Sequence, residues 1–584
     1  MNTGQLLPPV PAAAKGYFSV GSAMFKGSPA TSLPLLLLFT SVSPQCQTGS
    51  ESECQEHTDF VPGHSLAGEG IDITTLEKKG AKVLDMNQWQ KLDGSCILCR
   101  NPLLEGKPLQ KLPLTVTDWE AKVACHRKVH TSLQESGLSV VQEEGSDVKN
   151  NWKAGLDVDV KPKINTHVAL VGSHSKMADF SVQKSSQDKY SFASHEVSCS
   201  YYSFRTGHHW VLTHHFKHAV KNLPKKYQPA SRLEYRQLIE TYGTHFIRQI
   251  HLGGRVRDVT AVRVCEVALD GVTADEVKDC LSIEASVSIG DKGKMDAAYE
   301  ACEELKKKKN FKGSFHQTYS ERQTEIVGGN SQTDLLFSDD QNAEAFKDWL
   351  EGLKSMPGLV SYSLEPIHTL VPKEDPKRES LRQALSEYVT ERALWRNCTQ
   401  PCPQGTQRSA RDACSCVCSS DSTTNSMCCS RERGLGKLTV TIQRAHDLWG
   451  DYFTRTDAYI KVFYMGREMR TSTIWNNNNP EWKVHLDVGN VQVLGETSKV
   501  RVQVWDEDNK WDDDLLGSCD RTLQSGKPHN EICYFAHGQL QFQYHLVCGP
   551  YLGGPYCLDY IPHQPKYVGD LLQRKTDTMK QKAP

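Results

Sequence analysis

The sequence predicts a multidomain protein in which a large α+β region is followed by a small cysteine-rich module and an all-β domain. Three observations support this fold class. The chain has 584 residues, more than one domain usually holds. Seven of its 20 cysteines lie between Cys398 and Cys429. Residues 436–545 alternate as short strands, whereas the region before the cysteines mixes helical and strand patterns.

The charge balance excludes one class of partner. Lys and Arg number 68 against 70 Asp and Glu, and the formal net charge is -2. Because there is no overall positive charge, we expect no nucleic-acid partner, and any attraction to a membrane must be local. The hydrophobic content of 38% is typical of a globular protein.

The N-terminal part predicts export. The apolar run Leu33–Phe39 is far shorter than the ~20 residues that a membrane-spanning helix needs. Lys15 and Lys26 precede it, as in a secretory signal, and Met24 is an alternative start. We therefore assign residues 1–43 to a leader and signal peptide and expect a secreted protein. A disordered N-terminus is the alternative.

The cysteines predict disulfide bonds, because an even number of crowded cysteines in an exported chain is typical of a disulfide framework. A zinc site is the alternative, since Cys414, Cys416 and Cys418 alternate, but no histidine pair accompanies them. The sequon at Asn397 predicts N-glycosylation in the same compartment.

Two helices are predicted in the large region. Residues 231–246 carry apolar side chains at helical spacing, the last of them Phe246. Asp375 and Pro376 open the second helix, whose apolar stripe continues toward the cysteine cluster.

Two stretches of the large region give conflicting signals. Residues 281–289 alternate strictly between apolar and polar, as a strand does, yet their flanks favour helix. Residues 178–182, within the stretch 158–198, alternate in the same way. Such a conflict indicates a segment with two structures, and an amphipathic edge strand is the alternative. Both stretches are long enough for transmembrane β-hairpins, which many chains would have to join into a closed barrel.

Two clusters of aspartates lie in the C-terminal domain. They span residues 449–457 and 505–517 and are interspersed with large aromatic residues. Carboxylates at this density repel one another unless a hard cation binds between them, and calcium takes roughly six to eight oxygen ligands. Acids and aromatics together on two loop tips predict calcium-dependent insertion into a membrane surface.

The run from Tyr235 to Phe246, with a glycine pair after it, resembles the signature of the membrane attack complex/perforin family. The residues that carry the resemblance are Tyr235, Tyr242, Gly243, Thr244, His245, Phe246, Gly253 and Gly254. The glycines suit a sharp bend of the backbone, and His245 is interpreted as structural rather than catalytic. The resemblance extends to the order of the parts, since a module similar to an epidermal growth factor repeat and a C2 domain follow.

The resemblance implies a domain organisation. It comprises a pore-forming (MACPF) domain over residues 44–390, an EGF-like module over 391–432, an all-β C2 sandwich over 433–545 and a tail over 546–584. The first domain would be a bent antiparallel sheet flanked by two helical clusters. These clusters match residues 158–198 and 267–325, and in the family they unfurl into transmembrane β-hairpins after monomers assemble on a membrane.

The resemblance also implies which side chains act. The calcium ligands would be Asp451, Asp457, Asp506, Asp508 and Asp514, and the membrane-dipping aromatics would be Trp449, Tyr452, Phe453 and Trp511. The disulfides would be Cys46–Cys99, Cys54–Cys96, Cys125–Cys199, Cys265–Cys429, Cys280–Cys302, Cys398–Cys414, Cys402–Cys416, Cys418–Cys428, Cys519–Cys533 and Cys548–Cys557. It is open at this point whether the bond between Cys280 and Cys302 permits a hairpin to extend.

These inferences predict a secreted, calcium-dependent cytolysin that docks on phospholipid membranes, assembles into a ring or arc of identical subunits and inserts β-hairpins without a chemical step. Storage in acidic cytolytic granules would keep it inactive. One alternative is a lipase, because Gly63–Gly68 around Ser65 superficially resembles a nucleophile elbow, although Pro62 precedes it. The other alternative is a non-lytic adhesion protein that uses the C2 domain only to bind membranes.

Overall fold

The computed structural model describes most of the chain after the predicted signal. The described residues are 45–57, 59–158, 166–207, 210–291, 296–309, 311–330, 334–337, 343–399, 401–410, 414–450, 452–508, 512–563 and 572–574. The predicted leader and signal peptide, residues 1–43, therefore lie outside the described residues.

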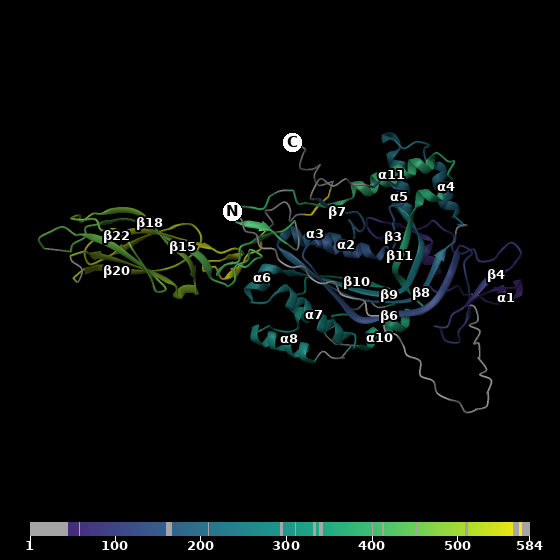
Figure 1. Ribbon diagram of the computed structural model, residues 1–584, viewed down its shortest axis with the longest axis horizontal. Helices are drawn as coiled ribbons and strands as arrows, with labels where there is room; N and C mark the ends of the chain where they lie inside the picture. The colour runs from purple at the N-terminus through teal and green to yellow at the C-terminus, as the bar shows by residue number, and fades with distance from the viewer. Residues whose placement is uncertain are drawn as a thin grey trace, which may run out of the picture. The chain divides into compact units, whose positions relative to one another are not determined.

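A seven-stranded antiparallel sheet forms the scaffold of the large region (Figure 1). Its strands are β2 (Glu69–Asp72), β3 (Glu77–Lys82), β6 (Val116–Gln134), β8 (Tyr190–Thr206), β9 (His245–Arg263), β10 (Arg322–Val327) and β11 (Gly358–Pro366). They run in the order β3-β2-β9-β8-β6, and both β10 and β11 pair with β9. A separate small sheet consists of β1 (Cys46–Gly49), β4 (Cys96–Arg100) and β5 (Leu109–Lys111), with α1 (Glu51–Glu56) after its first strand.

The long strands of the large sheet bend where their pairing is irregular. Three register shifts interrupt the pairing of β6 with β8, and another lies between Ser200 and Tyr202, where β8 pairs with β9. An extra residue in one strand of a pair bends that strand and increases its twist. Gly253 and Gly254 of the signature pair with β8 at this level. The sequence-based expectation of a bent antiparallel sheet is therefore met.

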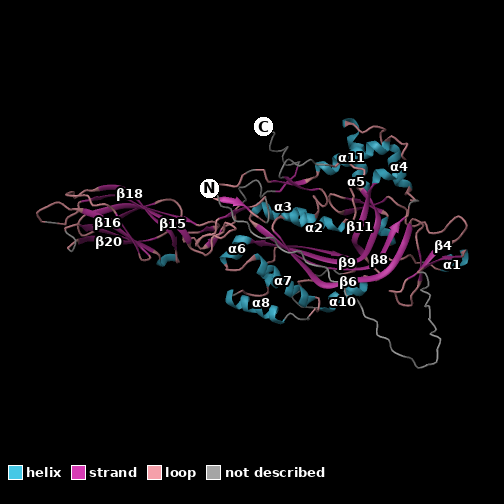
Figure 2. Cartoon of the chain, viewed as in Figure 1, coloured by secondary structure: helices cyan, strands magenta, loops and turns pink. Residues whose placement is uncertain are grey.

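Helices lie on both sides of this sheet (Figures 1 and 2). One side carries α2 (Gly137–Glu144) and α3 (Lys176–Gln187), and the other carries α6 (Val264–Leu269), α7 (Ala274–Ser288), α8 (Asp296–Lys309) and α10 (Ala343–Gly352). The short α9 (Phe315–Thr318) contacts α7, and α5 (Arg232–Tyr242) contacts both α4 (His214–Asn222) and α11 (Lys377–Glu391). Because helices cover both faces, β8 and β9 are buried along most of their length.

The helix expected over residues 231–246 is shorter than its apolar pattern indicates. It ends at Tyr242, and Phe246 is instead a fully buried residue of β9. Gly243 ends the helix with φ of 76°, and a Cβ there would lie 2.6 Å from the backbone of Ile71. Only glycine fits this turn, so the strand begins where the helical spacing alone predicted another turn.

The edge-strand alternative for the two alternating stretches is wrong for this structure. Residues 281–288 belong to α7, and residues 178–182 belong to α3. The helix α7 begins with a capping box in which Thr273 and Glu276 satisfy each other's backbone N–H groups. The period-two pattern is therefore present in a helical segment, as the resemblance to the family implied.

The cysteine-rich module contains β12 (Leu394–Asn397), β13 (Thr406–Arg408) and β14 (Cys416–Cys418). The strand β12 pairs on one side with β7 (Thr166–Ala169) and on the other with β25 (Leu572–Arg574) from the end of the chain. Asn397, the expected glycosylation site, therefore lies on a strand that pairs with β7. The helix α11, which leads into this module, begins directly after Pro376, as predicted.

Two four-stranded sheets form the β-sandwich that follows (Figure 2). One has the order β18-β15-β22-β21, and the other β17-β16-β19-β20. The strands are β15 (Leu435–His446), β16 (Ala458–Tyr464), β17 (Arg467–Arg470), β18 (Glu481–Gln492), β19 (Lys499–Asp506), β20 (Asp514–Thr522), β21 (His529–Tyr534) and β22 (Gln539–Cys548). A hairpin of β23 (Leu552–Gly553) and β24 (Asp559–Tyr560) follows. The remaining elements are the 3-10 turns η1 (His64–Ala67), η2 (Gly145–Asp147), η3 (Pro229–Ser231), η4 (Ile367–Leu370) and η5 (Gly495–Thr497).

All ten disulfides that the resemblance implied are present in the structure. The zinc alternative for the cysteine cluster is contradicted, because Cys414, Cys416 and Cys418 each form a disulfide. No helix within the described ranges is long and apolar enough to cross a membrane.

Candidate calcium and membrane site

The strand register gathers the acidic segments at one end of the β-sandwich. Ala458 at the start of β16 pairs with Asp506 at the end of β19, and Asp506 pairs in turn with Asp514 at the start of β20. Asp457 directly precedes β16, and Asp508 lies two positions after the end of β19. Four of the five predicted calcium ligands therefore lie at or near neighbouring strand ends. The fifth, Asp451, lies outside the described residues.

Asp506 is the innermost of these acids, with 1% of its surface exposed. Its Oδ1 accepts a hydrogen bond of 2.6 Å from the backbone N–H of Asp457. A Cβ added to Gly450 would lie 1.7 Å from Asp506 Oδ2, so glycine is needed for this close approach. The first acidic segment is thus held against the carboxylate of the second. Asp457 is half-buried beside it, and Asp508 and Asp514 are exposed.

A turn of four asparagines supports the first acidic segment. Asn476 N–H donates to Asp457 Oδ1 over 2.5 Å, and Asn478 Oδ1 accepts from Thr456 N–H over 2.9 Å. Asn479 Oδ1 accepts from Asp447 N–H over 3.0 Å. These asparagines were not among the predicted site residues. Four consecutive asparagines before a proline were the available signal, because asparagine side chains readily bind nearby backbone groups.

Two other acids of the second cluster are engaged elsewhere. Glu507 lies 2.6 Å from the guanidinium of Arg470 and accepts a hydrogen bond from the Thr473 hydroxyl. Asp513 accepts a hydrogen bond of 2.8 Å from the hydroxyl of Tyr459, and burial together with this bond raises the pKa of Tyr459 to about 12. Glu507 and Asp513 therefore bind neighbouring protein side chains.

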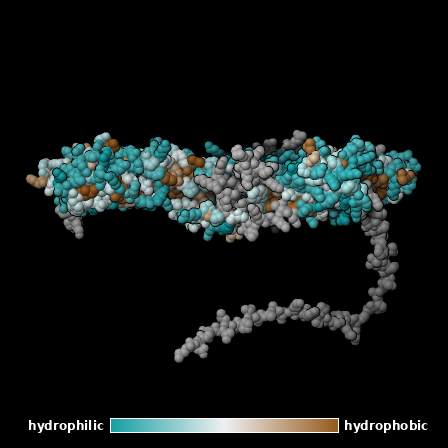
Figure 3. Space-filling view, turned by 90° about the horizontal axis from the view of Figure 1, so that it is seen from above, coloured by the Kyte–Doolittle hydropathy of each residue, from teal (hydrophilic) through white to brown (hydrophobic). Residues whose placement is uncertain are grey.

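The aromatic side chains of the first segment are exposed. Trp449 is 41% exposed, Tyr452 86% and Phe453 fully so, and the rings of Trp449 and Tyr452 meet edge to face with centroids 5.0 Å apart. Figure 3 shows hydrophobic surface at this end of the sandwich, on the left of the view. Trp511 lies outside the described residues. Trp475, which was not among the predicted aromatics, is 63% exposed and directly precedes the asparagine turn.

The donors gathered here fit calcium. Asp457, Asp506, Asp508 and Asp514 offer only carboxylate oxygens, which are hard ligands suited to calcium rather than to zinc or copper. Asp457 comes from the connection between β15 and β16, and the other three come from the connection between β19 and β20 and its flanking strand ends. This arrangement leaves the exposed acids able to approach a cation beside the buried one.

The signature residues of the large region build the core. His245 is fully buried, and its ring nitrogens lie 2.8 Å from Thr244 Oγ1 and 3.1 Å from Trp152 O. Burial lowers the pKa of His245 to about 4, so it stays neutral and structural. Ser65 lies in the 3-10 turn η1 rather than between a strand and a helix, which contradicts the nucleophile-elbow alternative.

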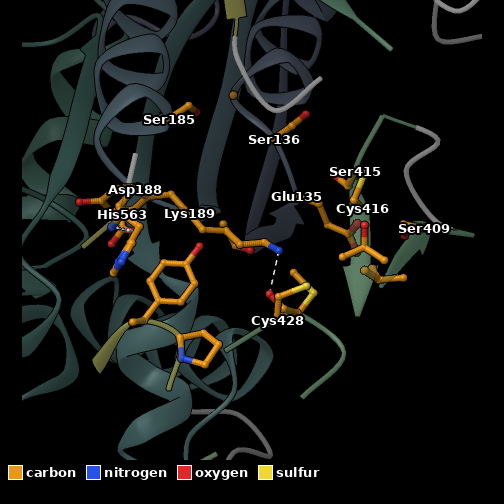
Figure 4. A pocket seen from close by; sticks show the side chains of 18 of the residues that line it. Glu135, Ser136, Ser185, Asp188, Lys189, Ser409, Ser415, Cys416, Cys428 and His563 are labelled. Carbon is orange, nitrogen blue, oxygen red and sulfur yellow. Dashed lines mark hydrogen bonds between the residues drawn. The ribbon is translucent and has the colours of Figure 1, made fainter. Parts of the chain in front are cut away.

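A cavity of about 350 Å³ lies where the end of α3, the cysteine-rich module and the C-terminal tail meet (Figure 4). Lys189 Nζ donates a hydrogen bond of 2.9 Å to Met427 O in its wall. Asp188, the residue that ends α3, accepts hydrogen bonds from the hydroxyl of Tyr560 and from His563 N–H. The wall of this cavity therefore ties α3 to segments far along the chain.

Comparison with known proteins identifies the family. The model of the MAC/Perforin domain matches residues 61–397. The chain belongs to the MAC/Perforin family. Two further domain models match the same chain. The model of the Perforin-1-like EGF domain matches residues 397–431, and the model of the C2 domain matches residues 436–535.

Three curated relatives of this MAC/Perforin chain are perforin-1 proteins. Perforin-1 of Homo sapiens is 49% identical over 520 residues, which cover 88% of this chain and 93% of that protein. Perforin-1 of Rattus norvegicus is 47% identical over 530 residues, covering 90% of this chain and 95% of the relative. Perforin-1 of Mus musculus is 46% identical over 530 residues, with the same coverage.

Proposed function

We propose that this protein is a secreted, calcium-dependent pore-forming cytolysin that docks on the membranes of target cells through its C2 domain and kills them in immune defence. The observation that carries the proposal is the meeting of Asp457, Asp506 and Asp514 on adjacent strand ends, directly beside exposed aromatic side chains. Membership of the MAC/Perforin family and the similarity to perforin-1 support it.

In this proposal, the acidic loops control docking. Asp457, Asp506, Asp508 and Asp514, with Asp451, would hold calcium, which supplies positive charge that offsets their mutual repulsion. Asp506 fixes the first acidic segment through the N–H of Asp457. The loops then approach anionic lipid without a charge penalty, and the aromatics Trp449, Tyr452, Phe453, Trp475 and Trp511 enter the interface.

The large domain then makes the pore. Docked monomers assemble side by side into a ring or arc, and the segments that hold α3 and the pair α7 and α8 extend into β-hairpins. A closed barrel of many chains satisfies the backbone hydrogen bonds that one hairpin would leave open in lipid. The mechanism needs no chemical step. Storage in an acidic granule before release would weaken calcium binding, because protons compete with the metal for carboxylate ligands, and would keep the protein undocked.

The calcium step is tested with Asp508→Asn. This change keeps the shape of the side chain but removes one exposed charge, so we expect calcium-dependent sedimentation with phosphatidylserine vesicles to need about tenfold more calcium or to disappear. Asp487→Asn is the matched control, because Asp487 is an exposed aspartate of β18 that pairs with Lys437 at 2.9 Å. Equal calcium dependence of the two variants would refute the calcium assignment.

Pore formation itself is tested by dye release from the same vesicles and by electron microscopy of lipid monolayers with and without calcium. Rings or arcs with release are expected. Calcium-dependent binding without release would favour the non-lytic adhesion protein.

A further inference from the structure

The disulfide between Cys280 and Cys302 joins α7 to α8 in the second helical cluster. Cys280 lies in α7 and Cys302 in α8, both are largely buried, and 22 residues separate them. The midpoint between them along the sequence is Asp291, in the connection that follows α7. If this segment becomes a β-hairpin, the two cysteines are equally far from its tip.

We propose that this disulfide stays intact during insertion and sets the register of the second transmembrane hairpin, with the tip at Asp291. The proposal rests on the pore-forming function proposed above. The bond fits both states, because its Cα atoms are 5.6 Å apart in the helical form. Residues directly opposite each other in an antiparallel hydrogen-bonded pair have a Cα separation of about 5.5 Å.

The register gives one apolar and one polar face. With Cys280 opposite Cys302, side chains directly opposite each other point to the same face. The pairs on one face are Leu281 with Ala301, Ile283 with Tyr299 and Ala285 with Ala297. The pairs on the other face are Cys280 with Cys302, Ser282 with Glu300 and Glu284 with Ala298. The first face suits lipid and the second suits a water-filled lumen.

The apolar face also has the right length. Its first strand runs from Leu281 to Ile289, which agrees with the ~9–11 residues that a transmembrane strand needs. On the same face, the next pair outward is Asp279 with Glu303, two acids that belong outside the hydrocarbon. A register shifted by one residue would instead place Glu300 beside Leu281 on the lipid face. The cysteine pair thus selects the register in which the apolar side chains of both strands lie on the same face of the hairpin.

The contacts of the helical form agree with this assignment. Glu284, on the polar face, accepts hydrogen bonds from Phe315 N–H at 2.7 Å and His316 N–H at 3.0 Å and lies 3.3 Å from Lys306 Nζ. On extension, water in the lumen replaces these partners, so the carboxylate is never transferred into lipid.

Two neighbouring alanines give a matched test. Ala297 and Ala298 are both exposed on α8, so a lysine at either position points into water in the described structure. In the hairpin, Ala297→Lys places a charge on the lipid face, whereas Ala298→Lys places it in the lumen opposite Glu284. With calcium and phosphatidylserine vesicles, we expect Ala297→Lys to reduce dye release per bound protein about tenfold or more, while Ala298→Lys retains most of it.

The outcomes separate this inference from the proposed function. Equal loss in both variants, or a greater loss with Ala298→Lys, overturns the register while wild-type release continues. Absence of wild-type release overturns the proposed function and the inference with it.

A second variant tests the cysteines themselves. The double change Cys280→Ser with Cys302→Ser should leave calcium-dependent vesicle binding unchanged and lower dye release severalfold, because the register is no longer fixed covalently. Unchanged or increased release would show that the bond does not assist the hairpin, and an increase would mean that it locks α7 to α8.

Discussion

Two tryptophans seven positions apart have opposite environments. Trp482 is 8% exposed, and its Nε1 donates a hydrogen bond of 3.1 Å to Ser472 O, inside the core of the β-sandwich. Trp475 is 63% exposed. Its neighbours are fixed, since Ile474 N–H donates to Ala458 O at 2.9 Å and Asn476 N–H donates to Asp457. Trp475 is therefore an exposed aromatic on a backbone that is held to Asp457 of the proposed calcium site.

Replacement of Trp475 tests its role at the membrane. Trp475→Ala removes a large aromatic surface that would enter the lipid interface, so we expect vesicle partitioning at saturating calcium to fall about tenfold, or ~1.4 kcal/mol. Met465→Ala is the control, because Met465 is 62% exposed and follows β16 at the end of the strand opposite the acids. Calorimetry of calcium binding without lipid should be the same for both, and equal partitioning of both variants would exclude Trp475 from the interface.

At the scale of single residues, the sequence predicts the chemistry of the site residues better than it predicts where each residue lies in the fold. The acids and aromatics of both loops are identifiable because their residue types alone indicate a cation and a lipid surface. The asparagine run indicates a turn, but neither it nor Trp475 is identifiable as part of the site, because the hydrogen bond from Asn476 N–H to Asp457 is a tertiary contact. Phe246 was misassigned for a similar reason, because the turn at Gly243 overrides its helical spacing.

Among the helices, α3 is held at both ends. Its N-cap, Ser175, donates its hydroxyl to Glu144 Oε2 over 2.5 Å, and at its other end Asp188 binds Tyr560 and His563. Burial raises the pKa of Glu144 from 4.5 to about 7, with Glu325 and Asp147 adding to the rise and Ser175 and Arg257 opposing it. The N-terminal contact of α3 therefore depends on a carboxyl group that titrates near neutral pH.

The contact predicts a dependence of stability on pH. Glu144 has a higher pKa in the folded state than in the unfolded state, so its stabilising effect is complete below pH 4.5 and is lost as the pH rises through about 7. The difference corresponds to about 3 kcal/mol. We expect the free energy of unfolding of wild type, relative to Glu144→Gln, to decrease between pH 4.5 and pH 7.5 in urea titrations. Parallel pH profiles of the two proteins would contradict the assignment.

At the scale of elements, the sequence showed that residues 281–289 are unusual but not which structure they adopt. Their alternation indicates a strand, yet the capping box of Thr273 and Glu276 and the contacts of Glu284 with residues 315 and 316 favour the helix α7. The last of these are tertiary contacts, so no period in the sequence reveals them. The long strands of the sheet were likewise implied by the family resemblance rather than by their own patterns.

In the molecule as a whole, the end of the chain returns to the large domain. Tyr560 donates its hydroxyl to Asp188, which lies 372 positions earlier, and burial beside that carboxylate raises the pKa of the tyrosine. Arg433 Nη2 lies 2.9 Å from Asp270, between α6 and α7. Both helical clusters are thus contacted by segments that follow the cysteine-rich module.

Removal of one hydroxyl tests this long-range contact. Tyr560→Phe keeps the ring but deletes the hydrogen bond to Asp188, and a bond to a charged group contributes about 1.5–3 kcal/mol. We therefore expect hydrogen–deuterium exchange of the backbone in residues 176–187 to become about tenfold faster or more. Tyr534→Phe, at a tyrosine that is 75% exposed, serves as the control. Unchanged exchange in both would mean that the tail does not restrain α3.

The disulfide between Cys265 and Cys429 has a mechanical consequence. It joins α6, at the root of the second helical cluster, to the residues directly before the β-sandwich, and it closes a separation of 164 residues. A force applied to a docked sandwich therefore reaches the base of α6 through one covalent bond, without first stretching the chain between. Under the proposed docking, Cys265 at the base of the second cluster would stay tied to the segment before the sandwich while the residues after it extend.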